Sequence, residues 1–71
     1  MRTEYAVEVY NKYHDNFVEQ IDVFNTYEEA EQFVKTTDID IDEDSEYLEI
    51  TEIEYNDSDI EISRTGLVAK Q

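Results

Sequence analysis

The chain has 71 residues, of which 20 are acidic and 5 are basic, so its formal net charge is −15. A chain this short forms one domain with a small core, because it buries only about 60% of the surface that its unfolded form exposes. The charge excludes the clustered lysine and arginine that capture nucleic acid or an anionic membrane surface. There is no cysteine and no apolar run long enough for a signal peptide or a membrane span. We therefore expect a single acidic domain over residues 1–71, located in the cytoplasm.

The acidic residues are concentrated in the second half of the chain. Residues 36–63 contain 12 acidic and no basic residues, which accounts for −12 of the net −15. High net charge opposes the collapse of a chain, but 39% of the residues are apolar, 13% are aromatic, and proline is absent. Because the apolar residues also recur with clear periods, we expect a folded chain.

Two strands are predicted before this acidic block. Residues 3–10 alternate so that Tyr5, Val7 and Val9 share one face of a strand. Residues 17–24 alternate in the same way, and the polar segment between the two runs is typical of a hairpin connection.

A helix is predicted over residues 27–36. Thr26 is a favourable N-cap, and Glu29, three residues later, completes a capping box. The apolar residues of the helix fall on one face, which we expect to lie on the sheet: Tyr27, Ala30, Phe33 and Val34.

The acidic block also contains strand-forming sequence. Residues 47–55, YLEITEIEY, are rich in β-branched and aromatic residues, which favours a strand. The alternation of the apolar residues slips by one position between Ile50 and Ile53. We therefore predict a β-bulge near Thr51 and Glu52.

A last strand is predicted after a turn-forming sequence at residues 55–60. It begins with Ile60 and Ile62 and continues to about residue 69, while residues 38–42 form either an edge segment or a loop. The predicted fold class is therefore α+β, a small antiparallel sheet of about four strands with one helix packed on one face, in the order β-β-α-β-β. In this fold the isoleucines form the inner face of the sheet, and the carboxylates line its outer face and edges.

One motif in the acidic block resembles a calcium-binding EF-hand loop. Residues 38–49, DIDIDEDSEYLE, place acidic side chains at loop positions 1, 3, 5 and 12, namely Asp38, Asp40, Asp42 and Glu49. The motif departs from the pattern at position 6, where Glu43 replaces the glycine that permits a sharp turn, and the sequence that follows is a poor exit helix. Calcium binding stays an alternative, and we expect no specific metal site.

Enzymatic chemistry is not expected. His14 is the only histidine and lies in a predicted turn, and the single glycine, Gly66, excludes a glycine-rich phosphate-binding loop. Paired carboxylates act as acid and base only where a pocket separates their pKa values. With 20 carboxylates on so small a body, most must be solvated, and we expect neither catalysis nor a cofactor.

The expected partner is a protein with a basic surface, such as a nucleic-acid-binding enzyme, because an acidic body attracts a basic groove. Tyr10, Tyr47 and Tyr55 are candidate anchors, since tyrosine is enriched at binding hot spots. The residues predicted to bind the partner all lie in the acidic block: Asp38, Asp40, Asp42, Glu43, Asp44, Glu46, Tyr47, Glu49, Glu52, Glu54, Tyr55, Asp57, Asp59 and Glu61.

In size, charge and organisation the whole chain resembles the DNA-mimic inhibitors that phages and mobile elements direct against restriction, repair or CRISPR enzymes. Carboxylates on a sheet stand about 4.8 Å apart across strands and about 6.6 Å apart along one face, the same order as the charges of a duplex, about one per 1.7 Å of axis. The resemblance implies a non-enzymatic interaction module that blocks the basic groove of a nucleic-acid-binding protein. The alternative is a small acidic accessory protein that joins a host or phage assembly through a tyrosine-rich face, without mimicry.

Overall fold

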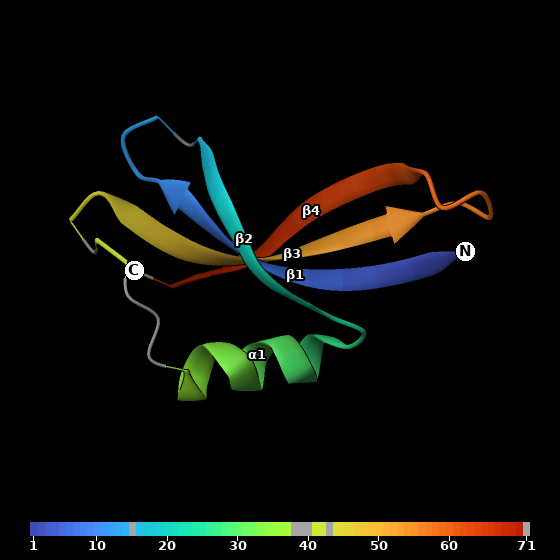
Figure 1. Cartoon of the computed structure of the whole chain (residues 1–71), viewed down its shortest axis with the longest axis horizontal. Helices are drawn as coiled ribbons and strands as arrows, with labels where there is room; N and C mark the ends of the chain where they lie inside the picture. The colour runs from blue at the N-terminus through green and yellow to red at the C-terminus, as the bar shows by residue number, and fades with distance from the viewer. Residues whose placement is uncertain (15, 38–40, 43, 71) are drawn as a thin grey trace.

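The computed structural model describes residues 1–14, 16–37, 41–42 and 44–70. In chain order the elements are the strands β1 (Arg2–Asn11) and β2 (Phe17–Phe24), the helix α1 (Tyr27–Thr36), and the strands β3 (Glu46–Tyr55) and β4 (Glu61–Lys70) (Figure 1). The strands form one antiparallel sheet in the order β2-β1-β3-β4, and α1 packs on one of its faces. The predicted α+β fold and the order β-β-α-β-β are confirmed. Residues 38–40, part of the predicted edge segment or loop, lie outside the described residues.

The helix α1 begins and ends at the predicted residues. Oγ1 of Thr26 accepts a hydrogen bond from the backbone N–H of Glu29 at 3.2 Å, and the Thr26 hydroxyl donates to Oε1 of Glu29 at 3.0 Å. The cap supplies a partner for an N–H group that has none within the helix. Glu28 and Glu29 in the first turn and Lys35 in the last turn also match the sign of the helix dipole at each end.

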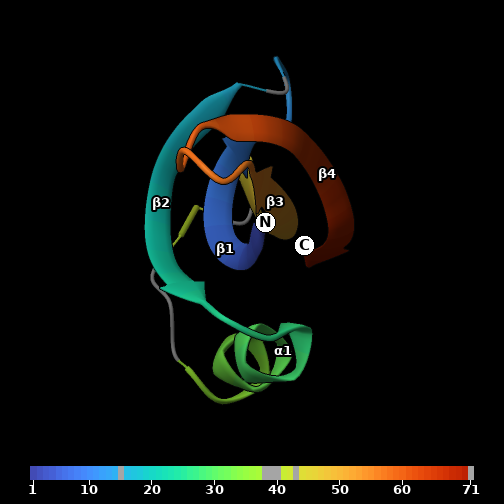
Figure 2. The ribbon, with the colours of Figure 1, turned by 90° about the vertical axis from the view of Figure 1, so that its right-hand side faces the viewer.

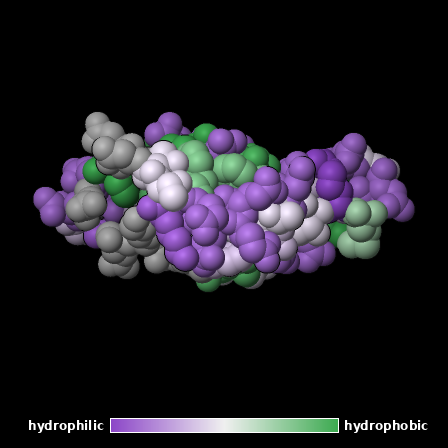
Figure 3. All heavy atoms as spheres, turned by 90° about the horizontal axis from the view of Figure 1, so that it is seen from below, coloured by the Kyte–Doolittle hydropathy of each residue, from purple (hydrophilic) through white to green (hydrophobic). Residues whose placement is uncertain are grey.

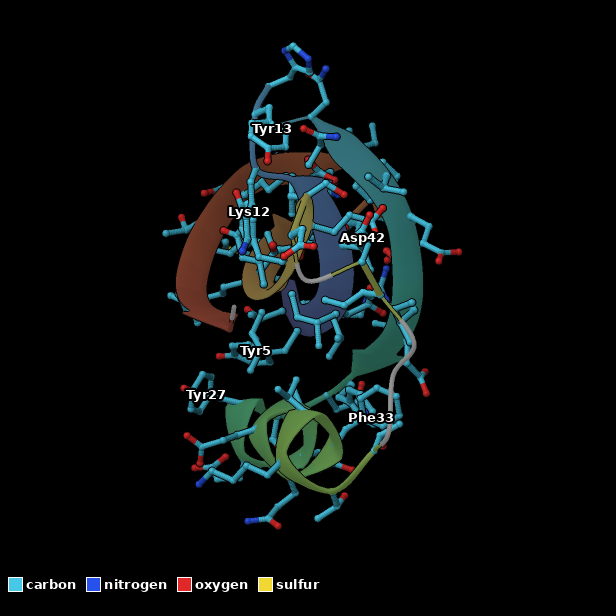
Figure 4. The ribbon with its side chains drawn as sticks, turned by 90° about the vertical axis from the view of Figure 1, so that its left-hand side faces the viewer. Tyr5, Lys12, Tyr13, Tyr27, Phe33 and Asp42 are labelled. Atoms are coloured by element: carbon cyan, nitrogen blue, oxygen red, sulfur yellow. The ribbon has the colours of Figure 1, made fainter. Side chains whose placement is uncertain are left out.

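The face of the sheet covered by α1, the helix-side face, carries the main apolar core. Its buried members come from β1, α1 and β3: Val7, Val9, Ala30, Val34, Leu48 and Ile50. Two aromatic pairs flank them, Tyr5 with Tyr27 at 6.2 Å and Phe24 with Phe33 at 5.2 Å between ring centroids. Figure 4 shows Tyr5 on the sheet above Tyr27 of the helix, so the predicted sheet-facing side of the helix is confirmed.

The opposite face of the sheet, the far face, is also buried at its centre. Ala6, Glu8, Thr51 and Ile53 project from β1 and β3 on this side, and each is at most 2% exposed. Figure 2 shows that the sheet is strongly coiled, with β2 and β4 curving around β1 and β3. The coil therefore encloses the middle of a face that no helix of the described chain covers.

Burial of both faces explains the slip in the apolar alternation of β3. This strand pairs with β1 without interruption, so Ile50 and Ile53 point to opposite faces. The predicted bulge in β3 near Thr51 and Glu52 is therefore wrong. A register shift does lie beside Thr51, but it concerns the pairing with β4, and the extra residue there is Leu67.

The isoleucines do not all form the inner face of the sheet. Ile50 and Ile53 are 2% exposed, whereas Ile60 and Ile62 are 61% and 52% exposed. β4 is an edge strand, and the second of its register shifts leaves Ile62 as an extra residue. Irregular edge strands pair poorly with other chains, so this edge is protected although it carries apolar side chains.

Because both faces of the sheet are buried, Ile50 and Ile53, which point to opposite faces, should contribute about equally to the free energy of unfolding. Ile53→Ala and Ile50→Ala should each lower the free energy of unfolding by about 2–4 kcal/mol, since each leaves a cavity among packed side chains. The exposed Ile60→Ala is the matched control and should change it by less than about 0.5 kcal/mol. Urea denaturation followed by circular dichroism measures all three. A cost for Ile53→Ala as small as that of the control would contradict a buried far face.

Candidate protein-interaction surface

The residues predicted to bind a partner do not lie on one face. Among the described residues, the turn before β3 and the first residue of β3 carry Asp42, Asp44 and Glu46. The rest of β3 and the start of β4 carry Tyr47, Glu49, Glu52, Glu54, Tyr55 and Glu61. The turn between β3 and β4 carries Asp57 and Asp59. Asp38, Asp40 and Glu43 lie outside the described residues.

Along β3 the acidic side chains are divided between the two faces. Glu52 and Glu54 lie on the helix-side face, opposite Tyr5 and Thr3 of β1, whereas Glu49 lies on the far face. The two acidic turns lie at opposite ends of this ten-residue strand, about 30 Å apart. The acidic block therefore surrounds the body instead of forming a single patch.

The turn before β3 is held by its own backbone. The carbonyl oxygen of Asp42 accepts hydrogen bonds from the N–H groups of Ser45 at 3.0 Å and Glu46 at 2.7 Å. In return the N–H of Asp42 donates to Oε1 of Glu46 at 3.0 Å, and Oδ1 of Asp42 accepts from the N–H of Asp44 at 3.1 Å. These bonds fix the exposed carboxylates of this turn relative to β3.

The turn between β3 and β4 is organised by Asn56. Its Oδ1 accepts hydrogen bonds from the N–H groups of Ser58 at 2.9 Å and Ile60 at 3.1 Å, and Asp59 adopts a positive φ of 61°. Asp57 pairs with the N-terminal amine at 2.8 Å, and Asp59 pairs with Arg2 at 3.2 Å. These two carboxylates are therefore partly neutralised by the start of the chain.

Three basic side chains are paired with carboxylates inside the molecule. Arg2 contacts Glu4 as well as Asp59, and Lys35 lies 3.6 Å from Glu31 on the helix. Arg64, the third, pairs with Glu8 and Glu61. The field outside the protein therefore comes chiefly from its many remaining carboxylates, and Figure 3 shows a largely hydrophilic surface on the side of the helix.

An ion pair with a buried carboxylate lies at the centre of the far face. Nη1 of Arg64 donates to both carboxylate oxygens of Glu8 at 2.9 Å, and the Tyr10 hydroxyl donates to Oε1 at 2.8 Å. Hydrogen bonding to Glu61, and then to Glu8, raises the pKa of Arg64 above its ordinary value. Glu8 is 1% exposed, so its carboxylate stabilises the fold and is not accessible to a partner.

A cluster of tyrosines and carboxylates on the helix-side face was not predicted. Tyr5 donates to Oε2 of Glu52 at 3.3 Å, and Tyr27 donates to Oε2 of Glu31 at 3.4 Å. Because the rings of Tyr5 and Tyr27 are in contact, packing of α1 on the sheet brings Glu31 of the helix and Glu52 of β3 to the same pair of rings. This cluster could have been predicted from the sheet-facing position of Tyr27, because that position places the acidic first turn of the helix next to β1.

The tyrosines predicted as anchors have different surroundings. The guanidinium carbon of Arg2 lies 4.3 Å from the centroid of the Tyr55 ring, so an internal cation covers this ring. Tyr47 stacks on Tyr10 with centroids 5.7 Å apart, and Tyr10 meets Phe17 edge to face at 5.9 Å. Phe17, which was not predicted as a site residue, is 53% exposed.

Comparison with protein-family models, with curated proteins and with solved structures finds no match. Within the described ranges, no helix is both long and apolar enough to cross a membrane.

The candidate calcium loop does not have the surroundings of an EF-hand. Glu49, at its twelfth position, lies in β3 instead of an exit helix, and its carboxylate covers the backbone of Gly66, where a Cβ atom would collide with it. Asp42 is engaged in the turn before β3. In the part of the chain that the structure describes, no three histidine or carboxylate side chains are grouped to hold a metal ion.

We predict that micromolar calcium does not bind specifically. Isothermal calorimetry at physiological salt, about 0.15 M, should show no saturable heat, because diffuse attraction of cations to exposed carboxylates is screened. Glu49→Gln serves as the control and should give the same trace. One-to-one micromolar binding that this substitution abolishes would instead establish the loop as a calcium site.

Four tyrosines have pKa values raised above 10.0, which is the ordinary value: Tyr5, Tyr10, Tyr27 and Tyr55. Burial is the largest cause in each case. A neighbouring carboxylate is the next cause, namely Glu52, Glu8, Glu31 and Glu4 in the same order. A negative phenolate is disfavoured beside these carboxylates.

These shifts predict a loss of stability at alkaline pH. The folded state keeps the four phenol protons to a higher pH than the unfolded state does. The contribution of these protonated tyrosines to the free energy of unfolding is therefore fully present below pH 10, and it is lost as pH rises through the raised pKa values of the folded state. Urea midpoints should fall in that range. Ultraviolet titration should show phenolate forming later in the folded protein than in urea, and identical titrations of the two states would contradict the prediction.

Proposed function

We propose that this chain is a non-enzymatic protein-interaction module that acts as a DNA-mimic inhibitor. It occupies the basic groove of a nucleic-acid-binding protein and thereby excludes the nucleic acid. A cytoplasmic location is part of the proposal, because proteins with such grooves meet nucleic acid there.

The observation that carries the proposal is the linear density of charge. The body measures 39 × 27 × 15 Å and has a net charge of −15, which is one negative charge per 2.6 Å when its long axis is divided by that charge. Duplex DNA carries about one charge per 1.7 Å of axis, and one of its strands about one per 3.4 Å. The protein lies between these values, so a groove spaced for phosphates meets a comparable number of carboxylates.

The arrangement of the carboxylates also supports a groove-filling role. They lie on both faces of β3 and in the turns at its two ends, so the elongated body is acidic on several sides, as a nucleic acid is. Strand pairing and the hydrogen bonds of the two turns hold these positions in place. Charges that are fixed before binding lose less freedom when a partner is bound.

Competition for one groove tests the proposal. A partner captured from the lysate of the native host at low salt should bind either this protein or a labelled duplex, with each displacing the other. The association rate constant should fall steeply as NaCl is raised, because attraction between opposite charges steers the encounter. Asp42→Asn together with Asp44→Asn should slow association and leave dissociation nearly unchanged, as expected for charges at the rim of an interface.

A ternary complex would favour the alternative function. An accessory module binds outside the groove, so its partner would hold this protein and nucleic acid together at unchanged affinity for each. That result would remove the mimic function and leave an acidic protein that joins an assembly through another surface. Fluorescence anisotropy of the labelled duplex, with and without saturating protein, distinguishes the two outcomes.

A further inference from the structure

Three aromatic rings form a row across the far face, called here the aromatic row. Phe17 of β2, Tyr10 of β1 and Tyr47 of β3 occupy paired positions on adjacent strands. Tyr10 and Tyr47 are stacked at an interplanar angle of 19°, and Phe17 stands edge-on to Tyr10 at 80°. Phe17 ends the row on the edge strand β2 and is 53% exposed, so the row opens onto the surface.

The aromatic row lies where two turns meet. The N–H of Lys12 donates to the carbonyl of Ser45 at 2.7 Å, and the Tyr13 hydroxyl donates to the carbonyl of Asp44 at 3.2 Å. These bonds join the β1–β2 turn to the acidic turn before β3, and Figure 4 shows Tyr13 and Asp42 at this end of the molecule. The exposed Tyr13 therefore lies beside the exposed Asp44, at the end of the sheet that carries the aromatic row.

Aromatic rings on a sheet bind flat groups by stacking. Nucleic-acid-binding sheets stack bases on such rings, and the guanidinium of arginine, which is also flat, is attracted to the face of an aromatic ring. The same rings suit both ligands, so the field around them selects between the two. A body with a net charge of −15 repels phosphates and attracts guanidinium groups.

The far face already holds one arginine in this way. At the other end of β1 and β3, the guanidinium of Arg2 lies 4.3 Å from the Tyr55 ring centroid, with Glu4 and Asp59 as its ionic partners. Arg2 and Tyr55 are a cross-strand pair, as are Tyr10 and Tyr47. An aromatic ring with flanking carboxylates is thus a working arginine site on this same face.

We propose that the aromatic row binds an arginine side chain of the partner protein, which stacks on Phe17 while the negative field of the body attracts its charge. The inference rests on the proposed function, because it assumes a basic partner. It adds that the partner must present arginine, and not lysine, to this end of the far face. Charge attracts both side chains, but the ring favours the flat and weakly hydrated guanidinium.

Two peptides of equal charge test this preference without knowledge of the natural partner. Fluorescein-labelled nona-arginine and nona-lysine are titrated with the protein at low salt and at about 0.15 M NaCl, and anisotropy gives both affinities. The protein should bind nona-arginine about tenfold more tightly than nona-lysine. Phe17→Leu, which keeps apolar bulk and removes the ring, should lower the affinity for nona-arginine toward that for nona-lysine and leave the latter unchanged.

Two further variants control the experiment. Phe17→Trp should preserve or increase the preference for arginine, because tryptophan binds cations best. Ile60→Ala changes an exposed apolar residue near the opposite end of the sheet, 61% exposed, and should change neither affinity. Thermal melts establish that each variant is folded; if Phe17→Leu is not, the comparison of the two peptides on the unchanged protein and on Phe17→Trp decides the matter.

The outcomes separate this inference from the proposed function. Equal affinity for the two peptides, or an equal loss in Phe17→Leu and Ile60→Ala, would overturn the arginine site and leave the attraction to basic partners intact. Failure to bind either peptide at low salt would overturn both. Tighter binding of single-stranded oligothymidine than of nona-arginine would show that the row stacks bases, and would also overturn both.

Discussion

The contact between Arg64 and Glu8 ties the edge strand β4 to the centre of the sheet across an intervening strand. Within the described residues β4 pairs only with β3 and has no contact with α1. Arg64 reaches past β3 to both carboxylate oxygens of Glu8 in β1, each at 2.9 Å. A carboxylate that is 1% exposed costs several kcal/mol unless it is paired. The far face can therefore be buried only while β4 curves over it, and the coil of the sheet depends on this pair.

The ion pairs that the arginines form within the chain also affect the charge that the protein presents on its surface. Arg64 and Arg2 both bind carboxylates of their own chain, so each cancels the charge of a carboxylate beside it instead of forming a positive patch on the surface. Most of the acidic residues that the structure describes lie in turns, on edge strands and on the helix, where water screens their repulsion. Stability and an acidic exterior are compatible here because Arg64 pairs with the one carboxylate whose burial makes pairing necessary among the described residues, that of Glu8.

The helix and the strands could be predicted from local sequence patterns. The distribution of the charges over the faces could not, because it depends on the coiling of the whole sheet. The helix and its cap at Thr26 follow from short-range spacing, and so do the strand limits. The opposite placement of Ile50 and Ile53 depends on both faces being buried, which a single strand cannot reveal. For the same reason an acidic run that is continuous in sequence was expected to form one face and is divided between two. The contact of Tyr10 with Phe17 requires the hairpin register with its shifts, and alternation alone does not give that register.

Charge and aromatic rings have separate tasks in the proposed interaction. A body that is acidic on several sides is attracted to any basic groove, but such a field does little to fix how the body lies within it. The two ends of the far face differ in chemistry, since Tyr55 already carries Arg2 while Phe17 is open to solvent. An arginine of the partner would stack on the exposed ring of Phe17, and that contact would set the direction in which the body enters the groove. In the proposed interaction the charge would speed the encounter, and the aromatic row would decide which encounters last.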